Sequence, residues 1–249
     1  MELNRGGSPR RRRSPLWAAL VALVVLGALG LTAGLIFYRS HVFSPRRMNW
    51  LMSFLTDPAS RPEWRINALE TCQGAPFQMP TDGYIGFLWG DSFRVGHHHQ
   101  GIDIFGGQDI GLTPVYTAYP GYMTRLPDWK STLIVRIPND PLQPGRQIWT
   151  YYTHMAAADG SSFIVDAFPP GTSEVPVEAG TLIGYQGNFS GSPDNPTGIH
   201  LHFSIVLDDG EGSFRNELDI DNTIDPSPYL GLPLNAWDNR DTVPLCATP

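Results

Sequence analysis

One stretch, residues 199–206, constrains the fold of this 249-residue chain more than any other. It reads Ile-His-Leu-His-Phe-Ser-Ile-Val, an apolar run interrupted by polar residues on one side only. Successive side chains of a strand point to opposite faces, so His200 and His202 share one face and Leu201 lies on the other. The run therefore predicts a strand that presents two imidazoles together, and imidazole is a leading ligand for zinc.

A second cluster of metal-binding residue types lies far upstream. His97, His98 and His99 form a run, and only His99 is followed four residues later by a carboxylate, that of Asp103. The two segments together can supply three metal ligands and leave a fourth coordination position open. That is the arrangement a hydrolytic zinc site needs.

The residues around Asp103 predict how its carboxylate is presented. Gly101 lets the backbone turn tightly after His99. Ile102 and Ile104 are then expected to face the core, with Asp103 on the opposite face. A buried carboxylate is costly unless it is paired or binds a metal. The sequence leaves one alternative open, a capped turn whose histidines lie on the surface.

Composition favours a β-rich body and argues against nucleic-acid binding. The chain holds 26 Gly and 23 Pro, and its formal net charge is −7. Five arginines and one glutamate in residues 1–15 contribute +4, and the apolar run that follows is uncharged, so the rest of the chain sums to −11. Nucleic-acid binding depends on neutralising phosphates, which so acidic a body does poorly.

Short apolar runs alternate with turn residues from Gly83 onwards. No helix-length apolar period separates them, so the expected fold class is mostly β, a compact domain of antiparallel strands. The expected strands are residues 84–89, 102–105, 115–118, 121–125, 132–137, 148–154, 181–186 and 200–207.

The 23 residues from Leu16 to Tyr38 contain no charged side chain and no histidine. A bilayer core needs about 20 apolar residues, so this run predicts a single-pass membrane anchor. The arginines before it favour a cytoplasmic N-terminus. A cleaved signal peptide is the alternative, although the apolar run is long and the small-residue site around Ala33 is weak. In both cases the body is expected outside the cytoplasm, and the retained anchor places it at the cell membrane.

The two cysteines of the sequence, Cys72 and Cys246, flank the body. An oxidising compartment allows them to form one disulfide. Closing so long a loop stabilises the fold by about 4–5 kcal/mol in the chain-entropy model. Two unpaired thiols are the alternative.

The sequence predicts five segments. They are a basic cytoplasmic tail (1–15), the anchor (16–38), a juxtamembrane helix and linker (39–82), the β domain (83–207) and an irregular C-terminal segment packed on that domain (208–249). Ser44 and Pro45 are expected to begin the short helix, which runs to about Leu55. Pro226, Pro228 and Pro233 are expected to prevent regular helix in the last segment.

Five short motifs together resemble the lysostaphin-type, or LytM-like, zinc metalloendopeptidases. They are residues 99–104 (His-Gln-Gly-Ile-Asp-Ile), 113–118 (Thr-Pro-Val-Tyr-Thr-Ala), 152–155 (Tyr-Thr-His-Met), 177–184 (Val-Glu-Ala-Gly-Thr-Leu-Ile-Gly) and 198–203 (Gly-Ile-His-Leu-His-Phe). Their order and spacing fit that family from Gly83 to Val206.

The resemblance implies a site and a substrate. His99, Asp103 and His202 are the implied zinc ligands, and His154 and His200 work beside the metal. The implied fold is a compact antiparallel β domain with its site in a groove, and the implied substrates are peptide cross-links or stems of bacterial peptidoglycan. Residues 138–146 and 188–197 are expected to border the groove, so substrate preference does not transfer.

The chemistry of these residue types agrees with that implication. The sequence lacks the His-Glu-x-x-His motif of helical zinc peptidases, so His154 and His200 are expected to move protons or stabilise an oxyanion, without a division of roles. Three alternatives stay open: a non-catalytic adaptor that regulates another cell-wall hydrolase, a metal-independent binding domain, and a zinc hydrolase acting on another substrate class. The oligomeric state is not predicted.

Overall fold

The computed structural model describes residues 15–42, 45–92, 96–239 and 241–246. These fall into two compact units that divide after Phe43. The first unit is the helix α1 (Pro15–Val42), in which Leu16–Leu35 is long and apolar enough to cross a membrane. Residues 39–42, predicted to begin the linker, belong to this helix instead. The predicted basic tail lies outside the described residues, apart from Pro15.

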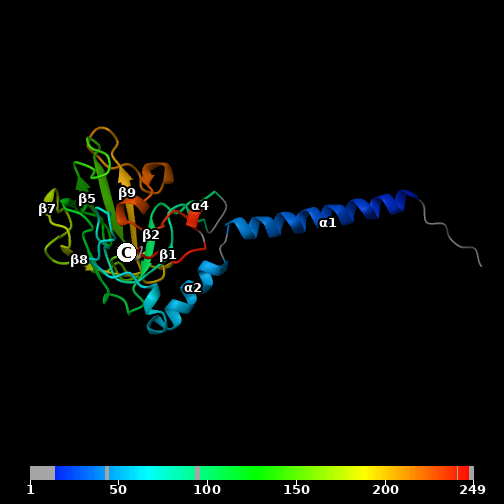
Figure 1. Cartoon of the computed structure of the whole chain (residues 1–249), viewed down its shortest axis with the longest axis horizontal. Coiled ribbons are helices and arrows are strands. Elements are labelled where there is room, and N and C mark those ends of the chain that lie inside the picture. The colour runs from blue at the N-terminus through cyan, green and yellow to red at the C-terminus, as the bar shows by residue number, and fades with distance from the viewer. Residues whose placement is uncertain (1–14, 43–44, 93–95, 240, 247–249) are drawn as a thin grey trace, which may run out of the picture. The chain divides into compact units, whose positions relative to one another are not determined.

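The second unit is built from antiparallel strands, as predicted (Figure 1). One sheet has the strand order β1-β2-β9-β6-β5-β4-β7, with β10 beside β9, and β3 and β8 form a separate pair. The strands are β1 (Tyr84–Phe87), β2 (Ile102–Phe105), β3 (Pro114–Tyr116), β4 (Gly121–Thr124), β5 (Leu133–Ile137), β6 (Ile148–Thr153), β7 (Val175–Val177), β8 (Leu182–Tyr185), β9 (Leu201–Leu207) and β10 (Thr223–Ile224).

Alternation along β2 and β9 separates the core from the opposite face of the sheet. Ile102 and Ile104 of β2 and Leu201 and Phe203 of β9 are fully buried in the main hydrophobic core. Burying an apolar side chain of this size stabilises the fold by about 1.5–3 kcal/mol. The predicted inward orientation of the two isoleucines is therefore confirmed.

Short helices surround the sheet. They are α2 (Pro45–Thr56), η1 (Pro58–Ser60), η2 (Pro62–Trp64), η3 (Ile220–Asn222), α3 (Ser227–Leu230) and α4 (Ala236–Asn239). The predicted short helix is confirmed by α2, whose Leu51 and Phe54 pack on Tyr84 and Phe105. Ser44, its expected cap, lies outside the described residues. Two strands, β7 and β10, were not predicted. The central Pro176 of β7 is tolerated because β7 is an edge strand.

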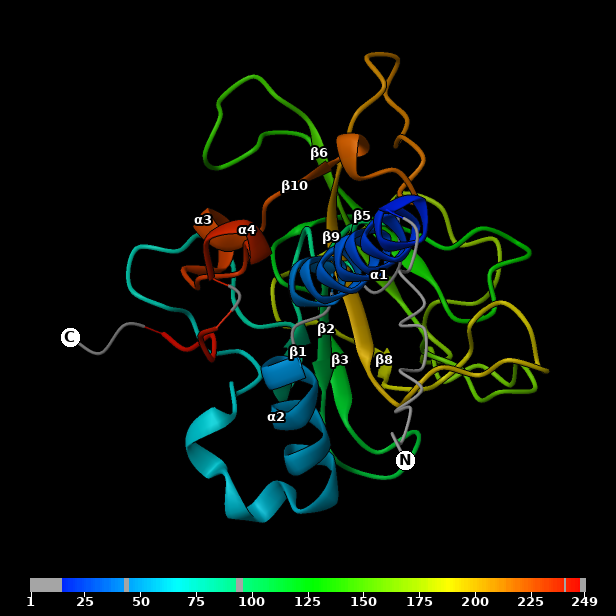
Figure 2. The ribbon, with the colours of Figure 1, turned by 90° about the vertical axis from the view of Figure 1, so that its right-hand side faces the viewer.

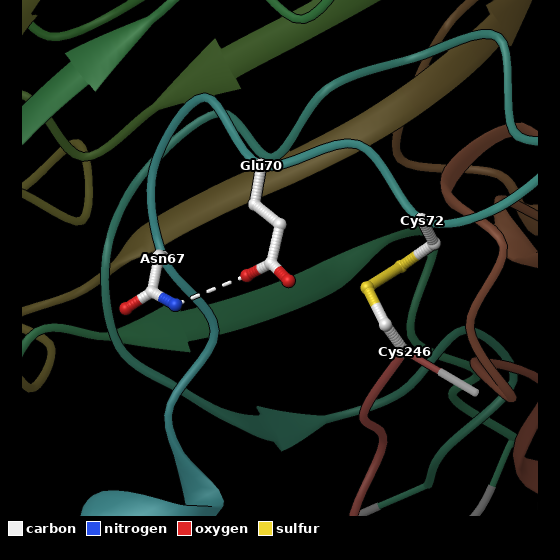
Figure 3. Close-up of a disulfide and its surroundings, with 4 residues drawn as sticks. All are labelled: Asn67, Glu70, Cys72 and Cys246. Atoms are coloured by element: carbon white, nitrogen blue, oxygen red, sulfur yellow. Dashed lines mark hydrogen bonds between the residues drawn. A yellow bond between two sulfur atoms is a disulfide. The ribbon is translucent and has the colours of Figure 1, made fainter. Parts of the chain in front are cut away.

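The C-terminal segment is more regular than predicted. It contains β10, α3 and α4, all three labelled in Figure 2. Pro228 lies in the first turn of α3, where a missing N–H costs nothing, so this proline does not prevent a helix. The predicted disulfide is present: Cys246 of this segment is bonded to Cys72, close to the hydrogen-bonded pair Asn67 and Glu70 (Figure 3).

Candidate metal centre

Three neighbouring strands bring the predicted site residues together. Asp103 of β2 lies directly opposite His202 of β9, and His202 lies opposite Thr153 of β6. His154 follows β6 directly, and His200 precedes β9 directly. The antiparallel register therefore joins segments that are far apart in the sequence.

The chain bends at Gly101, as predicted. This glycine does not have a positive φ, so it is not needed for a left-handed turn. A Cβ atom at this position would lie 2.2 Å from the carbonyl oxygen of Phe203. The glycine thus permits the close approach of the chain before β2 to β9, which places His99 beside His202.

Donor atoms of His99, Asp103 and His202 converge on one point. His99 Nε2 lies 3.0 Å from both Asp103 Oδ1 and His202 Nδ1, and the latter two atoms are 2.8 Å apart. All three side chains are buried. Ligand atoms around a tetrahedral zinc ion lie roughly 3.3 Å apart, because the bonds are about 2.0–2.1 Å long. Two imidazole nitrogens and one carboxylate oxygen at this spacing fit zinc.

Hydrogen bonds on the far side of each ring select the ligating nitrogen. His99 Nδ1–H donates to the carbonyl oxygen of Leu88 at 2.9 Å, which leaves Nε2 facing the other donors. His202 Nε2–H donates to Glu217 Oε1 at 2.8 Å, which leaves Nδ1. Partners of this kind fix the tautomer and orientation of metal-binding histidines. Both imidazoles are therefore preorganised for ligation.

Electrostatics favour positive charge at the centre of this cluster. Burial raises the pKa of Asp103, but the charges of His99 and His200 and the hydrogen bonds of the cluster outweigh it and hold this pKa well below the ordinary value. Burial lowers the pKa of His202, but Glu217 and Asp103 outweigh it and raise it to about 10. Two ionised carboxylates thus flank His202, and a divalent cation meets the same demand for positive charge.

His154 and His200 lie beside the three ligand candidates. Their ring centroids are 4.6 Å apart, and His200 Nε2 is 3.5 Å from Asp103 Oδ1. His154 Nδ1–H donates to the carbonyl oxygen of Phe189, and His200 Nδ1–H to that of Gly198, each at 2.7 Å. Each ring therefore turns an unprotonated Nε2 away from the backbone.

Burial disfavours the charged form of both of these rings. Burial lowers the pKa of His154 to about 3, and the charges of His200 and His202 act in the same direction. Burial also lowers the pKa of His200. His154 has φ of +72°, in the left-handed region that non-glycine residues seldom adopt. Such backbone strain concentrates at functional sites, because the surrounding structure has to maintain it.

The cluster opens into a groove of about 870 Å³. All five predicted site residues line it, with Met48, Leu51 and Leu55 of α2 as an apolar wall. Of the two loops predicted to border the groove, residues 188–197 contribute to its lining. The prediction for residues 138–146 is wrong: Asp140 of that loop is buried against Tyr229 and Arg146 instead.

Three contributions to the site were not predicted from the sequence. Glu217 was one acid among many in a segment predicted to be irregular, yet it is buried and bonded to His202. Ser204, on the same strand face as His202, donates to the same Oε1 at 3.0 Å. The sequence gives no sign of this hydrogen bond, because a serine two residues after a histidine does not by itself indicate a partner. The groove wall formed by α2 was not predicted either.

Known proteins are similar to this chain only at low sequence identity and low TM-score. No family model and no curated protein matches the sequence. Among solved structures, this chain is similar to Helicobacter pylori Csd3 at 19% identity, over 63% of this chain and 33% of that one, with a TM-score of 0.38.

Two further solved structures are peptidases by name. The antimicrobial peptidase lysostaphin from Staphylococcus simulans gives 21% identity over 67% of this chain and 55% of that one, with a TM-score of 0.37. A putative glycyl-glycine endopeptidase lytM from Ruminococcus gnavus gives 24% identity over 53% of this chain and 45% of that one, with a TM-score of 0.34. The chain thus matches between a third and just over half of each of these three structures. The chemistry of this chain has to be derived from its own residues.

Proposed function

We propose that this chain is a membrane-anchored zinc endopeptidase that cleaves peptides of bacterial peptidoglycan. The observation that carries the proposal is the convergence of His99 Nε2, Asp103 Oδ1 and His202 Nδ1 within 3.0 Å of one another. Both imidazoles have their other nitrogen bonded away from the centre. Three protein ligands with an open fourth position characterise catalytic rather than structural zinc sites.

His99, Asp103 and His202 would hold the zinc ion, which would supply acidification of a water molecule and polarisation of a substrate carbonyl group. His154 and His200 supply the proton chemistry, because each presents a neutral Nε2 with its Nδ1–H committed to a backbone carbonyl. Such a ring accepts a proton from an attacking water and returns it to the departing amine. Once protonated, it also stabilises negative charge on the carbonyl oxygen.

Two features support the choice of substrate and location. The groove extends well beyond the cluster and is large enough for several residues of a peptide. The apolar helix Leu16–Leu35 supports attachment to the cell membrane, with the body outside the cytoplasm. The peptidoglycan peptides themselves follow from the five motifs that resemble the LytM-like family.

The test uses the full chain purified in detergent. We expect one zinc per chain, release of peptide fragments from peptidoglycan sacculi with masses that identify the cut bond, and loss of release after chelation. A matched variant, Leu112→Ala, changes an exposed side chain outside the groove and should leave both quantities unchanged. Absence of bound zinc would refute the proposal, and bound zinc without cleavage would favour the non-catalytic adaptor.

A further inference from the structure

The loop Leu88–Asp91 holds His99 from three sides. The carbonyl oxygen of Leu88 accepts from His99 Nδ1–H, as described above. Gly90 N donates to the carbonyl oxygen of His99 at 2.8 Å, and His99 N donates to that of Asp91 at 2.7 Å. Asp91 Oδ2 also accepts from Leu88 N at 2.7 Å, which closes the loop on itself. The position and the ring orientation of His99 therefore depend on this loop.

Trp89, the remaining residue of the loop, is held by the C-terminal segment instead. Its N–H donates to the carbonyl oxygen of Leu234 at 3.0 Å, and its carbonyl oxygen accepts from Ala236 N at 2.9 Å. The Trp237 ring packs edge-on against the Trp89 ring, with centroids 4.8 Å apart. Trp237 also covers Gly90, whose φ is +81°.

The C-terminal segment is itself fixed to other parts of the domain. Asn235 Nδ2 donates to Asp225 Oδ2 at 2.8 Å. The buried Arg47 of α2 donates from Nη2 to the carbonyl oxygens of Asn239 and Thr242, at 3.1 and 2.9 Å. Beyond these contacts, Cys246 of the segment is bonded to Cys72. It is thus a firm support behind the loop.

We propose that residues 234–237, which we call the strap, position the metal ligand His99 through the loop Leu88–Asp91. This inference rests on the zinc site proposed above. The loop connects the two, since Leu88, Gly90 and Asp91 form hydrogen bonds with His99, whereas Trp89 forms hydrogen bonds with the strap. Trp237 and Ala236 are therefore positioning residues, and loosening them lets His99 Nε2 move away from the other two donors.

Zinc affinity of the full chain, measured by competition with a chromogenic chelator, tests the strap. Trp237→Ala removes the packing on Trp89 and Gly90, and Ala236→Pro removes the N–H that bonds Trp89. Each should weaken zinc binding about 10-fold, the lower end of the effect of outer-shell partners of a metal ligand. The cobalt(II)-loaded Trp237→Ala variant should show altered absorption bands, and Trp237→Phe should recover most of the affinity.

Trp149→Ala is the matched control, because Trp149 is a buried aromatic residue in a separate cluster with Ile134 and Val206. It should lower the melting temperature without changing zinc affinity. If the wild-type chain binds zinc and both strap variants bind it equally well, the strap proposal is wrong and the zinc site stands. If the wild-type chain binds no zinc, both proposals fail. Should Ala236→Pro not fold, Trp237→Ala decides alone, because Trp237 is 55% exposed.

Discussion

Strands β2 and β9 and the irregular segments around them contribute to the metal centre in different ways. The strands supply Asp103 and His202 as opposite residues in one antiparallel register. The irregular segments supply what surrounds them: the carbonyl oxygen of Leu88 behind His99 and the carboxylate of Glu217 behind His202. The sheet thus determines which atoms can meet, and the loops determine which nitrogen of each ring is presented.

This difference separates two kinds of loss. Removing a ligand from the sheet deletes a bond to the metal, whereas removing a loop contact leaves the ligand in place and loosens it. Damage to the sheet should therefore be close to all-or-none in metal binding. Damage to the loops should be graded and should appear first in affinity or in stability.

The largest effect is expected from His202→Ala. The variant loses one of three protein ligands, so zinc affinity should fall by about 10³-fold or more, and peptidoglycan cleavage should disappear. Zinc per chain after gel filtration measures the loss. Leu112→Ala, at an exposed side chain outside the groove, is the control and should keep its zinc. Retention of zinc by His202→Ala would show that the three donor atoms do not share an ion.

A large loss of stability, rather than of zinc binding, is expected from Cys72→Ser combined with Cys246→Ser. The disulfide spans 174 residues of sequence, so its removal should lower the free energy of unfolding by about 4–5 kcal/mol in the chain-entropy model. Urea titration followed by tryptophan fluorescence measures this change. Because β2 and β9 do not depend on the disulfide for their pairing, the folded variant should still bind one zinc at saturating metal. A variant that is folded but binds no zinc would contradict the division between sheet and loops.

Most of the strand contribution was predictable from the sequence. The period of two around His200 and His202 predicted a shared face, and Ile102 and Ile104 predicted the orientation of Asp103. Glu217 was not predictable, because its approach to His202 depends on how the chain folds back after β9 and not on any spacing. The close contact of Gly101 with Phe203 was not predictable for the same reason, since Phe203 belongs to β9, which lies far along the sequence.

Glu217→Gln tests the graded behaviour of the loops. The amide keeps the shape of the side chain and one oxygen acceptor for His202 Nε2–H, but it removes the negative charge. We expect zinc affinity to fall about 10- to 100-fold, while cleavage at saturating zinc remains. Chelator competition measures the affinity, and Glu211→Gln, an exposed acid in the same segment, is the control. Complete loss of zinc would place Glu217 among the ligands themselves.

The smallest effect is expected from Asp140→Asn, in the loop that lies away from the groove. Burial raises the pKa of Asp140, but hydrogen bonds from Leu142 N, Tyr229 and Arg146 outweigh it and lower this pKa. A lowered pKa stabilises the folded state above the unfolded value of about 3.9, and that stabilisation is lost as the pH falls through the folded value. The variant should therefore be about 1–3 kcal/mol less stable than wild type at pH 7.

The difference in unfolding free energy between Asp140→Asn and wild type should shrink as the pH falls below about 4, because the unfolded wild-type chain then binds a proton at Asp140 that the folded chain does not. The difference should be smallest once the pH lies below the lowered folded pKa, where the folded carboxylate is protonated too. Urea titrations at several pH values give this difference, with Asp194→Asn as an exposed control. Zinc affinity at pH 7 should match that of wild type, since Asp140 contacts neither His99 nor His202. A fall in the zinc affinity of Asp140→Asn would mean that a loop remote from the metal centre affects zinc binding as well. The strap would then not differ from the other loops in its effect on His99.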